Sequence, residues 1–527
     1  MRRRIDFLPP IAFSFVSPNI ENAEFLFHGE SQNTIGKKDV CKISGKGTLI
    51  FDFGKEYFGG IRLSFGPNSP MKGPNIRIRF GESLGEASSE IGEKGSSNDH
   101  STRDLALYFS PHSDMTIGST AFRFVRVDFL EEGDYYLQGA FLAFDYEAIP
   151  SLSFVSNDQV LNRIIEAAVR TLQLNVHHGV IWDGAKRDQH VWAGDLFPSC
   201  YAFLYAFDDY EPVKNSIDYI LSHYPLPTWY NGIPTYNIWF ALTVRKYLEF
   251  TQDKDPAYRK IIEDTISLIA STIQGGEWSD FAKIYPDSDW GYSFFDWISF
   301  PYEEKKYGIQ ALARYFLLQC QNDDSLSPKA RKLAKEAVAA IQVDFPEATP
   351  IKTVNALMLL AKVGNAGKLV HSIMEDGCQR WSSFLSYFLM LSLWENGKKE
   401  EAYLLGKEYY EGEIKMGGTT LFEEHDPSWT LSCTRIDEMP QQNLPDYHGD
   451  HGTDCYTGYR RSLAHAWATG ILPFVIENVL GIHVQEDGSV VFHPSLASAP
   501  SAYHLSFPHR GKTIVIEKEE GKDPIQK

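Results

Sequence analysis

The chain has 527 residues, which is enough for about three domains of ordinary size. Hydrophobic residues make up 43% of it and aromatic residues 14%, which excludes a largely disordered protein. With 50 Lys and Arg against 69 Asp and Glu, the net charge is −19, so neither nucleic acid nor an anionic membrane is expected as a partner. No apolar window of about 18 residues occurs, so no membrane-spanning helix is expected.

The first residues resemble a secretion signal only superficially. Asp6 and the pair Pro9 and Pro10 interrupt the apolar run, and no small-residue cleavage site follows. The 6 cysteines lie far apart, with neither zinc-binding CxxC spacing nor the density of a disulfide scaffold. We therefore expect a cytoplasmic protein with reduced thiols.

Residues 1–150 carry the pattern of β-strands. The segments 48–53, 76–80 and 122–127 are rich in β-forming residues, and clusters of Gly, Pro, Asn and Ser separate them. The polar stretch 86–102 predicts a surface loop. We expect an antiparallel β-sandwich as the N-terminal domain, residues 1–150.

From Ser156 the apolar residues recur at helical spacing, and Ser156 with Gln159 resembles a capping box. Many helices joined by aromatic, carboxylate-bearing connections predict an α-toroid, residues 151–475, whose helix ends surround a pocket. A return to strand patterns predicts a short C-terminal β-domain, residues 476–527. The predicted helical stretches are 211–222, 257–274, 303–320, 328–342, 353–363, 383–395, 399–410 and 462–480.

The densest polar segment, residues 183–195, follows the first predicted helix. It holds Asp183, Arg187, Asp188, Trp192 and Asp195. Carboxylates accept hydrogen bonds from sugar hydroxyls, and an indole packs on the apolar face of a pyranose. Neighbouring acids also raise one another's pKa, which lets one of them keep a proton. The alternative is a charged loop that caps helices and forms ion pairs.

Two further segments carry possible chemistry. Residues 417–426 place small residues directly before Glu423, which indicates either a close approach to a ligand or a glycine turn into a charged helix start. Residues 446–454 hold His and Asp, but their spacing fits no ligand set, so a polar loop is preferred and a cation there stays an open question. His465 lies alone among apolar residues, which is typical of a core imidazole.

Several known motifs are missing from the sequence. It has no Walker A loop, no GxGxxG after a strand, no GxSxG and no HExxH, which argues against nucleotide-driven, α/β-hydrolase and zincin chemistry.

Taken together, these segments resemble glycoside hydrolase family 78, the α-L-rhamnosidases. Residues 183–195 are similar to the family's Asp-x-x-x-Arg-Glu/Asp-x-x-x-Trp-x-Gly-Asp segment, and residues 418–423 to its Ala-Thr-Thr-x-Trp-Glu stretch. Residues 462–467 resemble its Ser-Leu-x-His segment, and residues 52–60 its preceding β-sandwich. The likeness covers most of the chain in the family's order.

This resemblance implies an (α/α)6 barrel catalytic domain flanked by the two β-domains, and an inverting glycosidase without a cofactor or metal. It assigns Asp188 as the general acid and Glu423 as the general base. The substrate would be a small-molecule rhamnoside, and a homodimer is possible. The residues implied to hold the sugar are Asp183, Arg187, Trp192, Asp195, Trp239, Asp296, Trp297 and His465.

Two departures from the family pattern keep alternatives open. Many members have Glu where Asp188 stands, and often Trp where Phe422 stands. A carbohydrate-binding protein that lost turnover is one alternative, against which Glu423 argues. Another barrel enzyme, such as a lyase or an unsaturated-uronyl hydrolase, is a second; it would need more Arg and Lys than Lys186 and Arg187.

Overall fold

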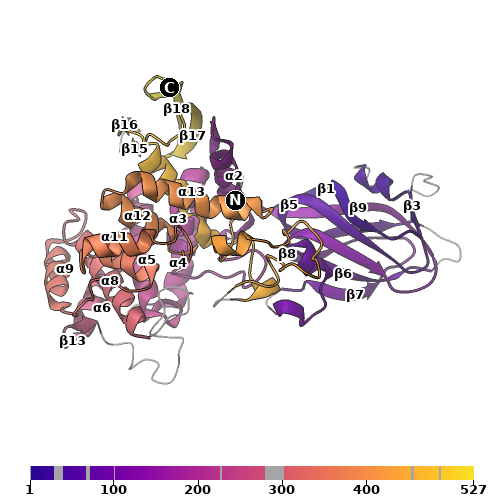
Figure 1. Ribbon diagram of the computed structural model, residues 1–527, viewed down its shortest axis with the longest axis horizontal. Helices are drawn as coiled ribbons and strands as arrows, with labels where there is room; N and C mark the ends of the chain where they lie inside the picture. Colours follow the sequence, from indigo (N-terminus) through magenta and orange to yellow (C-terminus); the bar gives the residue numbers. More distant parts are fainter. Residues whose placement is uncertain are drawn as a thin grey trace.

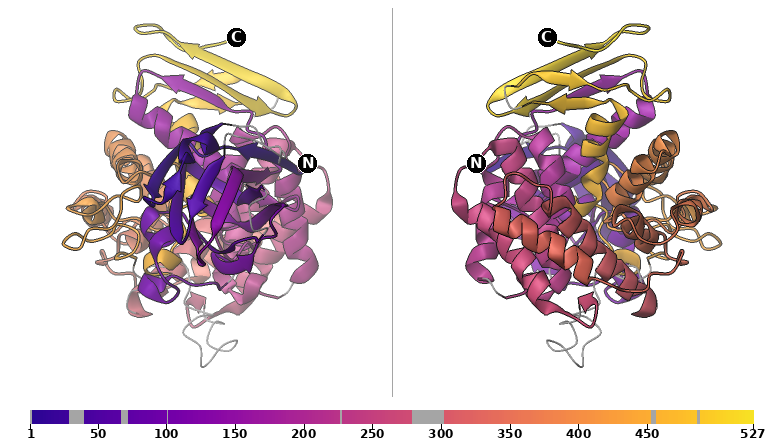
Figure 2. Two further views of the ribbon diagram at one scale, coloured as in Figure 1. Left: turned by 90° about the vertical axis from the view of Figure 1, so that its right-hand side faces the viewer. Right: turned by 90° about the vertical axis from the view of Figure 1, so that its left-hand side faces the viewer.

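The computed structural model describes residues 2–28, 40–66, 72–99, 101–225, 228–278, 302–452, 456–485 and 488–527. The N-terminal strands lie at one end of its long axis and the helices at the other (Figure 1). The last strands of the chain form a layer beside the helices (Figure 2). The predicted mixture of helices and sheets is confirmed, whereas the three domain boundaries stay predictions.

The N-terminal part is one antiparallel sheet, nine-stranded within the described residues, with the order β3-β4-β9-β5-β8-β6-β7. In addition, β1 pairs with β9 and β2 pairs with β5. The strands are β1 (Arg4–Leu8), β2 (Ala12–Val16), β3 (Ile20–Glu21), β4 (Cys41–Ser44), β5 (Gly47–Phe65), β6 (Asn75–Gly81), β7 (Asp104–Tyr108), β8 (Ser113–Phe129) and β9 (Asp134–Tyr146).

The long strand β5 is bent by a bulge whose pairing with β8 shifts between Asp52 and Tyr57. Gly59 follows at φ 144°, where an added Cβ would lie 1.9 Å from the carbonyl oxygen of Ala143, so only glycine fits. The bulge contains Glu56, whose amide donates to Thr419 Oγ1 at 2.8 Å. This contact joins the sheet to the chain just before Glu423.

The expected surface loop 86–102 is wrong at its start. Residues Leu84–Ser88 form the short helix α1, and Glu86, Ser89 and Ser96 are buried. The side chain of Arg103 donates to Ser96 Oγ at 2.5 Å and to the carbonyl of Glu86. Because an arginine supplies these bonds, much of the polar segment can be buried with its groups paired.

The helical part begins with α2, whose buried residues recur at helical spacing and whose cap is Asp158 rather than Ser156. Contacts run from α3 to α5, α8, α10 and α12 in turn, and α12 and α3 both contact α14. The helices are α2 (Gln159–Leu174), α3 (Leu196–Ala206), α4 (Glu211–His223), α5 (Pro234–Thr251), α6 (Pro256–Thr272), α8 (Tyr302–Cys320), α9 (Pro328–Ala340), α10 (Lys352–Leu360), α11 (Ala366–Met374), α12 (Ser386–Glu395), α13 (Lys399–Lys415) and α14 (Ile471–Phe474).

Within the described residues of the helical part, α3, α5 and α11 are helices that the sequence did not predict, and the long helix expected over 462–480 is wrong. Its first residues are extended, and a 3-10 turn (Ala466–Gly470), α14 and a π turn (Val475–Val479) follow. Every residue of this region from Ala466 to Val475 is buried, so no polar face marked where regular helix begins and ends.

Strand β10 (Ser153–Ser156) pairs with strands from the end of the chain in a sheet of order β10-β17-β18-β19. Leu505 and Ile516 of this sheet pack into the same core as the helices. The remaining strands are β11 (Val176–His177), β12 (Val180–Ile181), β13 (Ile273–Gln274), β14 (Glu277–Trp278), β15 (Ile482–Val484), β16 (Val490–Phe492), β17 (Tyr503–His509), β18 (Lys512–Lys518) and β19 (Ile525–Gln526).

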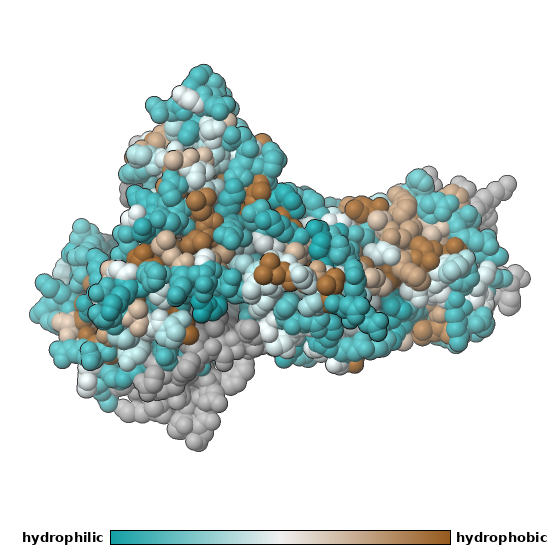
Figure 3. All heavy atoms as spheres, viewed as in Figure 1, coloured by the Kyte–Doolittle hydropathy of each residue, from teal (hydrophilic) through white to brown (hydrophobic). Residues whose placement is uncertain are grey.

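The surface is mostly polar, with apolar side chains gathered over part of the N-terminal sheet (Figure 3). Ile5, Phe7 and Phe15, on β1 and β2, are exposed apolar residues of this sheet. A homodimer stays a prediction. Among the described residues, no helix is both long enough and apolar enough to cross a bilayer.

The core of the N-terminal sheet extends into the segment that precedes the expected acid. Trp182 belongs to this core, with its ring 5.7 Å from that of Phe58 and 4.6 Å from that of His177. The N-terminal sheet and the segment 183–195 therefore share one packed interior.

We predict that Trp182→Ala lowers the free energy of unfolding by about 3–5 kcal/mol, because it leaves a cavity in this shared core. Denaturant unfolding followed by circular dichroism measures it. Phe15→Ala is the control, since Phe15 is 45% exposed, and it should change stability little. Equal, small losses in both variants would contradict the shared core.

Candidate active site

The segment 183–195 folds back on itself between β12 and α3. The amide of Asp183 donates to the carbonyl of His190 at 3.0 Å, and the amide of His190 donates to Asp183 Oδ1 at 3.0 Å. Asp188 and Gln189, at the turn, have left-handed backbones with φ of 60° and 51°. This reversal presents Arg187 and Asp188 together at its tip.

Arg187 joins the two expected catalytic carboxyl groups. Its Nη2 donates to both carboxylate oxygens of Glu423 at 2.6 Å, and its Nη1 contacts Asp188. Its Nε donates to the carbonyl of Arg460 at 2.7 Å, and the guanidinium lies 3.3 Å from the ring centre of Tyr456. One buried cation thus brings together side chains from distant parts of the sequence.

Glu423 is buried and held by several contacts. The amide of Ser462 donates to Glu423 Oε2 at 2.8 Å, and the amide of Glu423 donates to the carbonyl of Ser462 at 3.0 Å. The indole of Trp467 donates to the carbonyl of Glu423 at 3.0 Å. The carboxylate is therefore fixed by backbone as well as by Arg187, which suits a base that must meet its substrate in one geometry.

His465 lies beside Glu423, with its Nε2 3.8 Å from Glu423 Oε1. Burial lowers the pKa of His465 to about 4, so the ring is neutral near pH 7. Its Nδ1 is buried and has no hydrogen-bond partner within the described part of the chain. A buried ring nitrogen without a partner, in a ring that lies beside the Glu423 carboxylate, can bond a polar group of a ligand.

Asp183 and Asp195 are buried acids in the same segment. Burial, with Asp188 and Asp195 as further causes, raises the pKa of Asp183 well above its ordinary value. Burial also raises the pKa of Asp195 to about 8, although the hydroxyl of Tyr236 donates to it at 3.3 Å. Asp195 is therefore largely protonated near pH 7 and can donate as well as accept a hydrogen bond.

The aromatic residues expected around the sugar lie in different surroundings in the structure. Trp192 is half-buried, and its ring lies 6.4 Å from that of Tyr236. Trp239 is completely buried in the helical core against Phe197, Phe384 and Phe388, and its indole nitrogen has no hydrogen-bond partner within the described residues, so its expected role at the sugar stays a prediction. Asp296 and Trp297 lie outside the described residues.

The third polar segment behaves as a structural loop where it is described. Asp446 accepts hydrogen bonds from the amide of His448 at 3.0 Å and from the hydroxyl of Tyr459. Asp450 forms an ion pair with Lys94 at 2.8 Å. Asp454 lies outside the described residues. These contacts satisfy the two aspartates within the loop.

Sequence reasoning missed the residues that hold the acids in place. Ser462, Tyr236 and the backbone of Arg460 each bond an expected site residue. Ser462 stands in the segment that suggested His465, so proximity in sequence was a usable signal. Tyr236 carried none, because the chain has 27 tyrosines and this one lies in an unpredicted helix.

We predict that Asp195→Asn makes the protein more stable at alkaline pH. A carboxyl with a pKa of about 8 when folded and 3.8 ordinarily favours folding less and less as pH rises between these values. The uncharged Asn removes this loss, so the variant should exceed the wild type by about 1–3 kcal/mol at pH 8 and by little at pH 4. Denaturant unfolding at the two pH values measures the difference.

The exposed Asp208 supplies the control for this prediction. Asp208→Asn should leave the pH dependence of stability as in the wild type. If Asp195→Asn also leaves it unchanged, Asp195 ionises normally and the electrostatic description of the site is wrong.

Comparison with known proteins finds no matching family model and no matching curated sequence. Solved structures do match. A GH78 family rhamnosidase of Bacillus sp. GL1 has a TM-score of 0.67 at 15% identity, over 92% of this chain and 52% of that one. A rhamnosidase from Klebsiella oxytoca with rhamnose bound has a TM-score of 0.67 at 18% identity, over 90% of this chain and 96% of that one.

An α-L-rhamnosidase of Streptomyces avermitilis complexed with L-rhamnose has a TM-score of 0.67 at 14% identity, over 98% of this chain and 48% of that one. This chain thus spans about half the length of the Bacillus and Streptomyces proteins and nearly all of the Klebsiella protein. The resemblance seen in the sequence motifs is confirmed at the level of the fold: the chain has the fold of the GH78 α-L-rhamnosidases.

Proposed function

We propose that this chain is an inverting α-L-rhamnosidase that removes terminal, non-reducing α-L-rhamnose from small glycosides or oligosaccharides. The observation that carries the proposal is the contact of Arg187 with both Asp188 and Glu423 in one buried site. The fold shared with rhamnosidases supports the glycone. The frame would be an (α/α)6 barrel preceded by a β-sandwich, in agreement with the succession of helix contacts.

In the proposed reaction, Asp188 gives its proton to the glycosidic oxygen, and the bond from that oxygen to the anomeric carbon breaks. Glu423 takes a proton from a water molecule, whose oxygen forms the new bond on the opposite face of the sugar. An inverting pair needs carboxyl groups about 6.5–9.5 Å apart, to leave room for this water. Arg187 contacts both carboxyl groups and so holds the acid and the base in a fixed position relative to each other.

The remaining residues would bind the sugar. Asp183, the protonated Asp195 and the neutral His465 offer donors and acceptors to its hydroxyls. Trp192 offers an apolar face to the ring and the methyl group.

We predict that the wild type releases p-nitrophenol from p-nitrophenyl α-L-rhamnopyranoside. Asp188→Asn and Glu423→Gln should each lower kcat by about 10²–10⁴-fold, because each removes one proton-transfer group without changing its size. Asp208→Asn, at an exposed position, should keep wild-type kcat. Proton NMR during the first minutes should detect β-L-rhamnose as the first product.

Three results would contradict parts of this proposal. Wild-type kcat in Asp188→Asn or Glu423→Gln removes that residue from catalysis, and α-L-rhamnose as first product excludes inversion. Calorimetric binding of L-rhamnose without any turnover supports the carbohydrate-binding alternative. Neither binding nor turnover would mean a different glycone.

A further inference from the structure

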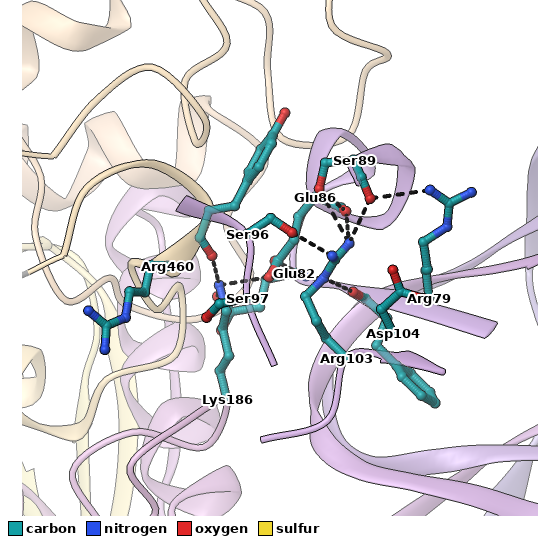
Figure 4. Close-up of polar contacts among 12 residues, drawn as sticks. Arg79, Glu82, Glu86, Ser89, Ser96, Ser97, Arg103, Asp104, Lys186 and Arg460 are labelled. Atoms are coloured by element: carbon teal, nitrogen blue, oxygen red, sulfur yellow. Dashed lines mark hydrogen bonds and ion pairs between the residues drawn. The ribbon is translucent and has the colours of Figure 1, made fainter. Parts of the chain in front are cut away.

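A second group of charged residues lies behind the acid-bearing segment, where the N-terminal sheet meets it (Figure 4). Lys186, adjacent to Arg187, points at two carboxylates of the β-domain: its Nζ is 2.9 Å from Glu86 Oε1 and 3.4 Å from Glu82 Oε2. Glu82 follows β6 and Glu86 belongs to α1. Glu82, Glu86 and Lys186 are 0%, 1% and 8% exposed.

The same group binds the segment that holds Glu423. Glu82 accepts a hydrogen bond from the amide of Leu463 at 2.7 Å and from Ser462 Oγ at 3.2 Å. Lys186 Nζ donates to the carbonyl of Arg461 at 2.9 Å and to that of Tyr459. Three stretches of chain, around residues 82–86, 186 and 459–463, are therefore tied together at one point.

The residues tied together here are the same as, or next in sequence to, the residues that bond Asp188 and Glu423. Ser462, whose hydroxyl bonds Glu82, donates its amide to Glu423. Arg187, next to Lys186, bonds the carbonyl of Arg460 and both carboxyl groups. A shift of Lys186 would be transmitted to both groups through these short lengths of backbone.

The buried charges of Glu82, Glu86 and Lys186 restrict how these side chains can move apart. Burial raises the pKa of Glu82 to about 7, and it raises that of the nearby Glu56 well above its ordinary value. Removing one partner from a buried ionic group leaves uncompensated charge, which is strongly unfavourable. His448 lies beside the carboxylates, but both its ring nitrogens are bonded, to Ser83 Oγ and to the carbonyl of Arg461. The ammonium group of Lys186 contacts both Glu82 and Glu86, and Arg103, with its Nε 3.9 Å from Glu86 Oε1, is a second cation beside Glu86.

We propose that Glu82 and Lys186 are positioning residues for the acid–base pair: the β-domain, through Glu82, holds Lys186 and Ser462 so that Arg187 stands between Asp188 and Glu423. The inference rests on the proposed function for its catalytic readout. Its structural content, that Glu82 and Lys186 fix segments 183–190 and 460–465, can be tested without turnover.

Kinetics test the proposal with Glu82→Gln, Lys186→Met and Lys186→Arg. Glu82→Gln keeps an oxygen for the amide of Leu463 and loses the charge, and Lys186→Met keeps most of the length and loses the cation. Both should lower kcat for p-nitrophenyl rhamnoside at least 10-fold, because Arg187 no longer holds Asp188 and Glu423 in one geometry. KM should rise as well, because Asp183 and His465 lie in the two segments that Lys186 holds. Lys186→Arg, which restores a cation, should recover most of kcat.

Asp128→Asn is the matched control, because Asp128 forms a buried ion pair with Arg79 in the same sheet, at 2.7 Å, and its hydrogen-bond partners within the described residues are Thr48, Arg79 and Arg126. It should keep wild-type kcat even where its melting temperature falls as far as that of Glu82→Gln. Wild-type kcat in Glu82→Gln and Lys186→Met, or an equal loss in Asp128→Asn, would overturn the proposal.

Hydrogen–deuterium exchange separates this inference from the proposed function. If the wild type is inactive, the proposed function fails, but the exchange experiment still decides the positioning role. Faster exchange in peptides covering 183–190 and 460–465 of Lys186→Met, and not of Asp128→Asn, supports it. Unchanged exchange in these peptides overturns it.

Discussion

The burial of the Arg187 guanidinium is the constraint on which the candidate site depends. A buried cation is tolerated only where carboxylates and carbonyls surround it, and Arg187 meets Asp188, Glu423 and the carbonyl of Arg460. These partners come from separate stretches of the chain, so the guanidinium determines how the stretches meet. Arg187 therefore brings together the side chains that are expected to act as acid and base.

A second buried cation, Lys186, is also surrounded by carboxylates and carbonyls, on the side of the N-terminal sheet. Lys186 repeats, toward the β-domain, what Arg187 does toward the pocket: one cation between two carboxylates, with backbone carbonyls as further acceptors. The two cations are consecutive in sequence, and both donate to backbone carbonyls of the segment 459–461. The N-terminal sheet therefore acts on the geometry of the site through ionic contacts as well as through the packing of Trp182.

A helix was easier to predict from the sequence where one of its faces is polar and exposed. Helix α2 was predicted because its buried residues, such as Leu161 and Ile165, recur at helical spacing beside exposed ones. In α3 every residue is buried, so no periodic pattern exists. The acid segment was found because its residues are consecutive. The contact between Arg187 and Glu423 could not be predicted, because 236 residues separate them and sequence spacing carries no information at that range.

The exchange of Glu for Asp at position 188, which looked like a weakness in the sequence, has a backbone reason in the structure. Asp188 has a left-handed backbone, with φ of 60°, and is followed by a second left-handed residue. Among residues other than glycine, Asp and Asn adopt this conformation several times more readily, because their short polar side chains bond locally. A longer Glu here would meet a conformational cost that Asp avoids, and the tight reversal itself brings the shorter carboxyl to Arg187.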